Sequence, residues 1–538
     1  VKEYLKRRRD EIKEFPIFKI SKVSKIDEIE KPKDITKTNI TYPLLEPFVY
    51  VNIKFDPSLR TLIYIIIEPE LNEEEIKTLN RIKKILMEIL VIEEMEKSLE
   101  TLEKVIKDTI KQLNLKLSPS QYLKFVYYLY RDFIGFNEIE PLLNDPLVED
   151  ISCDGVNVPV YVIHKTFGSI RTNITFTSEE YLQNLVIKMA QRAGKYISYA
   201  EPLLDATLPD GSRMAASLAK DVTTRGASFT IRKFREIPFS PVELIINKTC
   251  NEDVFAYLWL LVQYKVSMII VGGTGTGKTS LLNAICMFIP PEDKIVSIED
   301  TREIKLLHEH WVPGLARVGF GIAGPSGQKY GEITLFDLLR ESFRMNPDYL
   351  IVGETRGPET YVMFQGMASG HACLSTFHAT SLETLMKRLT SPPINLSPTL
   401  IESLGVVIVM GHAKEKGATA RRVREIIEII GVDPKSGEVN YNIVYKWNPS
   451  KDEIEKVNES MLIKRIASQT GVLEESLLEE LKKREKLLKR LVVVGKRDYE
   501  SFHEEIKKYY KGIPKKKMFP EKKGIRSIWD LIFSLKRS

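Results

Sequence analysis

The stretch VGGTGTGKTSLLNAI, residues 271 to 285, decides how the chain around it folds. An apolar run, VSMIIV, enters the stretch, and a segment with helical apolar spacing leaves it. Gly272, Gly277, Lys278 and Thr279 fit the pattern G-x-x-x-x-G-K-[ST]. In this pattern glycines let backbone N–H groups turn inward around phosphates, and the lysine reaches the β and γ oxygens. The stretch therefore predicts a strand, a nucleotide-phosphate loop and a helix whose N-terminus favours anions.

The loop predicts a nucleotide with Mg²⁺ as cofactors. The threonine hydroxyl at position 279 is suited to bind the metal ion. The residues expected to surround the nucleotide are consecutive: Gly272, Gly273, Thr274, Gly275, Thr276, Gly277, Lys278, Thr279 and Ser280. Phosphate loops of this kind occur in many classes of enzyme, so the loop leaves open what the nucleotide is used for.

The sequence around the loop alternates between apolar strands and helices. The expected strands are VSMIIVGG, KIVSIED, YLIVGE, ACLSTF and GVVIVMG, and this alternation is typical of a parallel sheet covered on both faces. Changes in composition and proline-containing linkers predict four regions of the chain. They are an N-terminal α/β and helical region (1–116), a second N-terminal α+β domain (117–238), the nucleotide domain (239–450) and a charged helical C-terminal tail (451–538).

Bulk composition narrows the class of protein. The chain has 538 residues and a net charge of +6, too weak a basic bias to indicate nucleic acid. Basic runs at 6–9 and 511–526 fit a solvated terminus, or contact with an acidic partner or an anionic membrane surface. Four widely spaced cysteines fit a reducing cytosol. Because no apolar run approaches the ~20 residues that span a bilayer, we expect a cytoplasmic protein that lies on a membrane at most.

Two acidic clusters follow strands of the nucleotide domain, where a parallel sheet gathers its ligands. KIVSIEDTRE offers Glu299, Asp300 and Glu303, and PDYLIVGETR ends on Glu354. The second cluster has Gly353 at the position where a metal-binding aspartate is usual. Hydrolysis needs one group that activates water and another that organises the metal. The alternative interpretation, a solvated strand end, is less favoured because two such ends accompany one phosphate loop.

Two histidines bracket the strand ACLSTF. They are His371 and His378, and the whole chain has seven histidines. No third ligand lies nearby, so a metal site is not indicated. We expect a sensor or relay role, in which the imidazoles connect the γ-phosphate region to the next element.

These motifs, taken in order, resemble those of the type II/type IV secretion ATPase superfamily. The phosphate loop, IEDTREI, RMNPDYLIVGETR and GHACLSTFHA resemble its Walker A, Asp box, Walker B and His box. EPLLNDPLVEDISCDG and LPDGSRMAASLAKDVTTRGASFTIRKF resemble its second N-terminal domain. YVNIKFDPSLRTLIYIIIEPEL and SPPINLSPTLIESLGVVIVM favour the archaeal pilus and archaellum-motor branch. The implied fold is α/β, a RecA-like P-loop NTPase domain with a parallel sheet, preceded by α+β domains.

The resemblance implies that the nucleotide is ATP and that the chain forms a homo-hexameric ring, which hydrolyses ATP and moves its domains. Its partner would be a polytopic membrane platform protein of a pilus, archaellum or secretion machine, reached from the cytoplasmic face of the membrane. Glu303 and Glu354 would activate water, Glu354 would also organise Mg²⁺, and the two are not ranked. His371 and His378 would be the sensor pair.

The resemblance also assigns arginines. Arg213 in GSR and Arg232 in TIRKF match positions that contact the nucleotide from the N-terminal domain. A permanently charged guanidinium suits the charge that develops on a transferred phosphoryl group. Arg340 and Arg344 match arginines of relatives, which suggests a role between subunits.

Two other functions remain open on the sequence. A RecA-type nucleic-acid translocase shares the phosphate loop, but no basic and aromatic patch is visible, so no nucleic acid is expected. A nucleotide-sensing assembly subunit with little turnover is disfavoured because Lys278, Thr279, Glu303 and Glu354 are all present.

Overall fold

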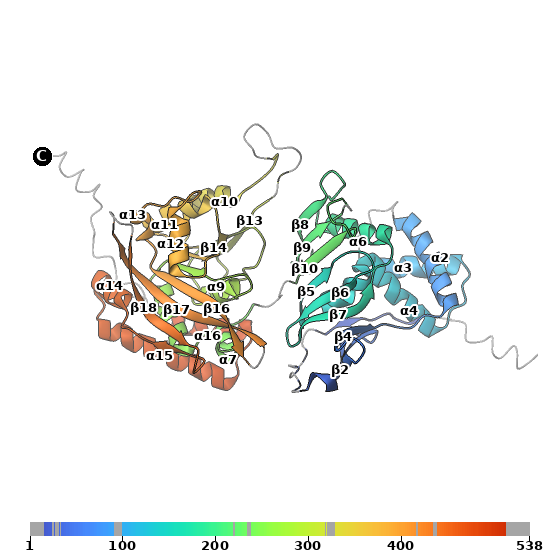
Figure 1. The fold of residues 1–538 in the computed structure, drawn as a ribbon, viewed down its shortest axis with the longest axis horizontal. Coiled ribbons are helices and arrows are strands. Elements are labelled where there is room, and N and C mark those ends of the chain that lie inside the picture. The colour runs from blue at the N-terminus through green and yellow to red at the C-terminus, as the bar shows by residue number, and fades with distance from the viewer. Residues whose placement is uncertain are drawn as a thin grey trace, which may run out of the picture. The chain divides into compact units, whose positions relative to one another are not determined.

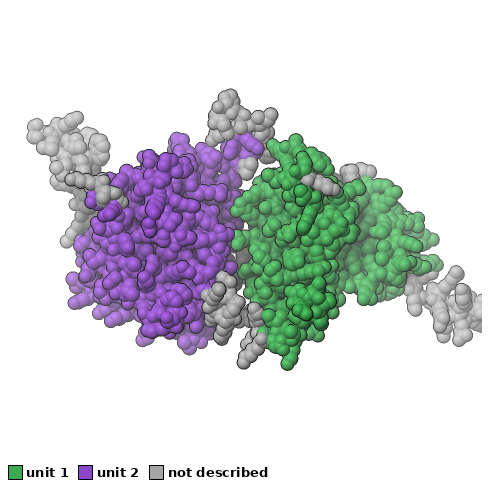
Figure 2. All heavy atoms as spheres, in the orientation of Figure 1, with its two compact units in different colours: residues 1–234 green, residues 235–538 purple. Residues whose placement is uncertain are grey.

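The computed structural model describes residues 15–512, apart from 24–25, 27–28, 30–31, 33, 91–98, 219–220, 234–237, 318, 320–328, 416–417 and 434–437. The basic run at 6–9 and all but the first two residues of the run at 511–526 lie outside the described residues. The chain forms two compact units, residues 1–234 and 235–538 (Figures 1 and 2). No helix within the described residues is long and apolar enough to cross a membrane.

The first unit is built on a sheet in the order β1-β2-β3-β4-β7-β6-β5-β10-β9-β8. Neighbouring strands are antiparallel except β4 and β7, which pair in parallel through Ile63 with Arg171 and Tyr64 with Thr172. This pair joins the β meander before residue 116 to the strands after it. The strands are β1 (Ser21–Lys22), β2 (Asn39–Glu46), β3 (Val49–Asp56), β4 (Thr61–Ile67), β5 (Val148–Cys153), β6 (Pro159–His164), β7 (Gly168–Thr175), β8 (Leu203–Thr207), β9 (Arg213–Ser217) and β10 (Ser228–Arg232).

One face of this sheet is covered by helices. In β3 the alternating residues Val49, Val51 and Ile53 are fully buried, as expected for a strand with one covered face. The charged segment after residue 71 forms helices whose apolar stripes, including Ile82 and Ile106, enter the same core. The helices of this unit are α2 (Glu73–Leu90), α3 (Leu99–Gln112), α4 (Pro119–Leu129), η2 (Tyr130–Ile134), α5 (Glu140–Asn144) and α6 (Glu179–Arg192).

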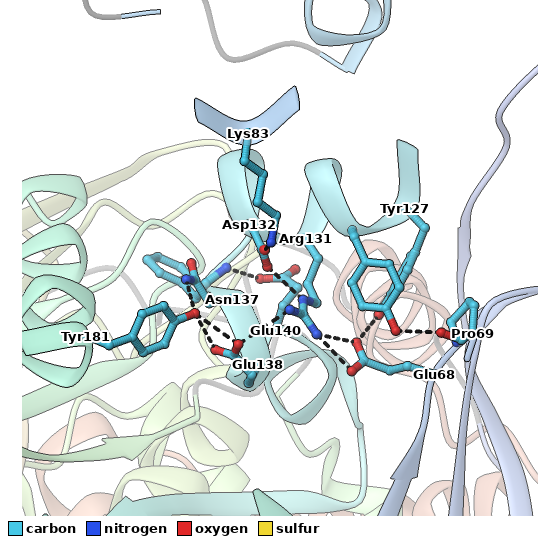
Figure 3. Close-up of polar contacts among 12 residues, drawn as sticks. Glu68, Pro69, Lys83, Tyr127, Arg131, Asp132, Asn137, Glu138, Glu140 and Tyr181 are labelled. Atoms are coloured by element: carbon cyan, nitrogen blue, oxygen red, sulfur yellow. Dashed lines mark hydrogen bonds and ion pairs between the residues drawn. The ribbon is translucent and has the colours of Figure 1, made fainter. Parts of the chain in front are cut away.

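A buried polar network connects the two predicted N-terminal regions (Figure 3). The Arg131 guanidinium in η2 lies 2.8 Å from a carboxylate oxygen of Glu68, which follows β4, and 2.8 Å from Asp132. Asp132 also pairs with Lys83 of α2, and Glu138 lies 3.5 Å from Arg131. Since a buried ion pair is costly to break, this network fastens the two regions together.

The second unit contains the sheet β13-β12-β14-β15-β11-β16-β17-β18-β19. The first six strands are parallel, which confirms the predicted parallel core; β17, β18 and β19 extend it antiparallel and were not expected. The strands are β11 (Met268–Val271), β12 (Ile295–Glu299), β13 (Trp311–Leu315), β14 (Tyr349–Thr355), β15 (Ala372–Phe377), β16 (Val406–Glu415), β17 (Ala418–Val432), β18 (Val439–Asn448) and β19 (Glu453–Lys456).

Both faces of this sheet are buried. In β11, Met268 and Ile270 enter one apolar core while Ile269 and Val271 enter the other, so the strand is apolar throughout. α8 and α9 contribute to the first core, and α10, α11 and α12 contribute to the second. The helices are α7 (Pro241–Ile246), α8 (Glu252–Gln263), α9 (Lys278–Cys286), α10 (Leu335–Ser342), α11 (Glu359–Ala368), α12 (Leu382–Thr390) and α13 (Pro398–Ile401).

Three further helices, α14 (Met461–Thr470), α15 (Glu474–Val494) and α16 (Tyr499–Lys511), belong to the first of these cores. The Trp259 indole of α8 donates to the Tyr510 hydroxyl of α16 at 2.8 Å, and the Arg484 guanidinium of α15 lies 4.9 Å from the Trp259 ring. Within the described residues, the segment from Met461 to Lys511 is thus mainly helical and packs into the unit, whereas Glu453–Lys456, placed by the sequence in the helical tail, forms β19.

Candidate nucleotide site

The loop after β11 has the backbone of a phosphate cradle. Gly275 and Gly277 have φ angles of 73° and 89°, a left-handed conformation that favours glycine. At Gly272 a Cβ atom would lie 2.5 Å from Thr276 Oγ1 and 3.1 Å from the Met410 carbonyl, so the backbone can pass only without a side chain. Because these glycines have no side chains, the backbone N–H groups of the loop can approach an enclosed anion closely, as phosphate binding requires.

Lys278 and Thr279 open α9, directly at the end of the loop. The Lys278 side chain is buried, and its Nζ donates to the Gly273 carbonyl at 3.0 Å. Thr276 Oγ1 donates to the same carbonyl at 2.9 Å. The N-terminus of a helix and a buried ammonium together favour an anion, so these residues fit the phosphates of a nucleotide.

The carboxyl end of β12 holds the first acidic cluster. Oε1 of Glu299 accepts the backbone N–H groups of Glu303 and Ile304, each at 2.8 Å. Burial, opposed by these two hydrogen bonds, raises the pKa of Glu299 to about 7. Glu303 itself is exposed, so Glu299 shapes the loop and Glu303 presents its carboxylate to solvent.

The neighbouring strand explains the glycine in the second cluster. A Cβ atom on Gly353 would lie 3.0 Å from Cγ of Glu299. The space that an aspartate at position 353 would need is therefore taken by Glu299 from β12.

Glu354 and His378 meet at the carboxyl ends of β14 and β15. Nε2 of His378 lies 3.0 Å from Oε1 of Glu354, and both side chains are partly exposed. Nearby, Arg356 donates to Asp300 at 2.9 Å, which links the ends of β14 and β12. The structure therefore brings the predicted carboxylate and one predicted histidine together.

The structure does not bring the two histidines together within one chain. His371 precedes β15 and lies at the amino edge of the sheet, so about seven residues at roughly 3.3 Å each separate it from His378. Its ring packs edge-on against Phe343 at 5.2 Å, and its carbonyl faces the Ser267 hydroxyl at 3.5 Å. A joint sensor role for the two imidazoles stays a prediction.

Arg213 and Arg232 lie in the first unit. They are direct cross-strand partners on β9 and β10 and share the exposed face of the sheet. Arg213 binds Asp205 through two hydrogen bonds of 3.1 and 2.6 Å, and Arg232 lies 3.7 Å from Asp150. The two adjacent guanidinium groups are thus balanced by acids on the flanking strands.

Arg340 and Arg344, for which the resemblance suggests a role between subunits, lie elsewhere in the second unit. Arg340 of α10 packs over the Phe336 ring at 5.8 Å, and Arg344 pairs with Glu341 at 3.1 Å. Both arginine side chains are exposed or partly exposed, and neither contact involves the phosphate loop.

Two residues that touch the phosphate loop were missed by sequence reasoning. Nε of Arg421, on β17, donates to the Gly275 carbonyl at 3.0 Å, and its Cδ lies 3.3 Å from where a Cβ on Gly277 would be. His412, on β16, lies 3.4 Å from the Thr274 carbonyl. No motif spacing relates these positions to the loop, because the antiparallel pairing of β16 and β17 creates the contact.

Comparison with known proteins gives a consistent result. Residues 135–420 match the family described as type II/IV secretion system protein. An uncharacterized protein of Methanocaldococcus jannaschii is 36% identical over 506 residues, which cover 89% of this chain and 90% of that protein. The type IV secretion system protein PtlH of Bordetella pertussis is 29% identical over 278 residues, 46% of this chain and 80% of that protein. The solved Legionella pneumophila ATPase DotB is 15% identical, covers 73% of this chain and 92% of that chain, and has a TM-score of 0.36.

Proposed function

Because this chain belongs to the family of type II/IV secretion system proteins, we propose that it is an ATP-hydrolysing motor of such a machine. The observation that carries the proposal is the pairing of Glu354 with His378 at the strand ends beside the phosphate loop. Carboxyl ends of parallel strands converge on one edge of a sheet, which is where such folds bind ligands. A carboxylate at this place can hold Mg²⁺ or accept a proton from water, and hydrolysis needs both of these roles.

Each residue has a role set by its position. Backbone N–H groups of the glycine loop and Lys278 would bind the phosphates, and Thr279 with Glu354 would hold Mg²⁺, which neutralises charge on the transferred group. Glu303 or Glu354 would take the proton from the attacking water. His378 would orient Glu354 through its 3.0 Å contact.

The arginines of the first unit extend the proposal. Arg213 and Arg232 lie opposite each other on an exposed sheet face, each beside an acid of a flanking strand. Guanidinium groups stabilise developing phosphoryl charge, so this pair would contact the nucleotide of its own or a neighbouring subunit. Nucleotide occupancy would then set the geometry between units, as a motor requires.

The proposed assembly is a homo-hexameric ring at the cytoplasmic face of the membrane. It would act on a polytopic platform protein that inserts or extracts pilin-like subunits, in a pilus, archaellum or secretion machine. The family supports a secretion or pilus machine, and the archaeal source of the M. jannaschii relative supports the archaeal pilus and archaellum-motor branch.

Phosphate release by the purified full chain tests the proposal. Wild type should release phosphate with Mg²⁺·ATP, and Lys278→Ala should be slower by about 100-fold or more. Glu354→Gln or Glu303→Gln should lower kcat by about 100-fold, and the stronger effect identifies the group that activates water. Lys387→Ala, in an exposed pair on α12, is the matched control. Absence of wild-type turnover, or full turnover in both glutamine variants, would refute the assignment.

A further inference from the structure

The segment that bears Glu303 is held from three sides. Glu299 of β12 binds the N–H groups of residues 303 and 304, as described above. The other two contacts come from α9, the helix of the phosphate loop, and from α16 near the end of the described chain. These last two contacts have no part in the resemblance to secretion ATPases or in the proposed chemistry.

Asn283 makes the contact from α9. Its Nδ2 donates to the Glu303 carbonyl at 3.0 Å, and its Oδ1 accepts the Lys305 N–H at 3.0 Å. The side chain is buried, and it pairs with the backbone on both sides of Ile304 as a neighbouring strand would. Nδ2 also lies 3.3 Å from the Thr279 carbonyl. One amide group therefore ties the helix of Lys278 and Thr279 to the segment of Glu303.

Tyr499, the first residue of α16, makes the contact from the other side. Its hydroxyl donates to the Lys305 carbonyl at 2.5 Å, across 194 positions of sequence. Beside it, the rings of His308 and His503 pack at 5.1 Å, and Ile304 is fully buried. Helix α16 thus packs against the segment that follows Glu303.

We propose that Asn283 and Tyr499 are positioning residues for ATP hydrolysis, which fix Glu303 relative to Thr279 and make α16 part of the site. This inference rests on the proposed function. The bonds attach to the backbone of residues 303 and 305, so losing one frees the Glu303 carboxylate while the apolar packing stays. A positioned carboxylate matters in the transition state more than in nucleotide binding, so the loss should appear in kcat.

The test compares two hydroxyl deletions on one helix. Tyr499→Phe removes only the bond to the Lys305 carbonyl and should lower kcat by a factor of about 3 to 10, with KM for ATP unchanged. Tyr510→Phe is the control, because Tyr510 is also buried on α16 and its hydroxyl bonds with the Phe288 carbonyl and the Trp259 indole instead of the Glu303 segment. Asn283→Ala, which loses both bonds to the segment and the bond to the Thr279 carbonyl, should lower kcat further.

Peptide-level hydrogen exchange supplies a readout that needs no turnover. Residues 300–307 should exchange about 3 to 10 times faster in Tyr499→Phe and Asn283→Ala than in wild type or Tyr510→Phe. If wild type releases no phosphate, the proposed function fails while exchange still decides whether the segment is clamped. The inference would be overturned if Tyr499→Phe kept the wild-type kcat, changed only KM, or left hydrogen exchange of residues 300–307 unchanged. It would also be overturned if Tyr510→Phe lost as much kcat as Tyr499→Phe.

Discussion

Nε2 of His378 lies 3.0 Å from Oε1 of Glu354, at the ends of two neighbouring parallel strands. The two residues are 24 positions apart in the sequence, but the parallel pairing of β14 and β15 places both at the same edge of the sheet. An imidazole this close to a carboxylate restricts the orientation of that carboxylate, and a mutation can measure the effect.

The Glu354–His378 contact predicts coupled effects on turnover. His378→Ala should lower kcat by about 10-fold, because the 3.0 Å contact with the imidazole no longer orients Glu354. In a Glu354→Gln background the same change should cost much less, and a double-mutant cycle on kcat measures the difference. His310→Ala, an exposed histidine before β13, is the control. Additive effects would show that the two side chains act independently.

Arg421 predicts a contribution to nucleotide binding from β17. Arg421→Met removes the donor to the Gly275 carbonyl, which loosens the phosphate loop. We expect the Kd for ADP, measured by calorimetry, to rise about 3- to 10-fold. Arg465→Met, which removes a comparable 3.1 Å donor to the Ile430 carbonyl, should leave this Kd unchanged. Equal affinities in both variants would remove Arg421 from the site.

The pair Arg213 and Arg232 predicts a loss of turnover without a loss of fold. Each Arg→Met variant should lower kcat by about 10-fold or more, since a guanidinium near the phosphoryl group stabilises the transition state. Because each residue is exposed at a sheet surface, the free energy of unfolding should change by only about 0.5 kcal/mol. Arg81→Met, on the exposed side of α2, is the control. Wild-type kcat in both variants would leave the arginines as surface residues.

His503 predicts acid sensitivity of the second unit. Burial, with a smaller effect of the neighbouring His308 ring and Lys507 opposed by Glu504, lowers the pKa of His503 to about 4. The unfolded imidazole binds a proton near pH 6.5, so this contribution is present above that pH and is lost as pH falls toward about 4.

Between about pH 7.5 and about pH 5, wild type should lose about 2 kcal/mol more than His503→Gln in urea unfolding. All four tryptophans follow residue 234, so tryptophan fluorescence follows the second unit alone. Parallel pH profiles in the two proteins would contradict this origin.

Arg131 predicts a large stability effect in the first unit. Arg131→Met leaves Glu68 and Asp132 partly buried without their shared cation (Figure 3), and should cost about 3 to 5 kcal/mol. Far-ultraviolet circular dichroism in urea measures the change. Lys37→Met, in an exposed pair with Asp34 at 4.0 Å, should cost no more than about 1 kcal/mol. A loss that small for Arg131→Met would show that the network contributes little.

Sequence predicted most of what is local or periodic. The phosphate loop is a contiguous backbone motif, so its glycines, Lys278 and Thr279 could be assigned directly. Apolar runs that alternate with helices predicted five of the six parallel strands, and β13 was not expected. Glu354 and His378 could be expected near the loop because parallel strands place their carboxyl ends together. The antiparallel strands β17 to β19 were missed because they follow without the helices that mark parallel crossovers.

What the sequence determined by itself is the chemistry available: a phosphate loop, carboxylates at strand ends, and arginines on a separate region. Only the tertiary structure determined which of these distant residues contact one another. Strand direction separated His371 from His378, antiparallel register set Arg213 opposite Arg232, and packing brought Arg421 and Tyr499 to segments 146 and 194 positions away. Side-chain type and spacing fix local conformation, whereas contacts between distant segments depend on how the apolar faces of whole elements are buried together.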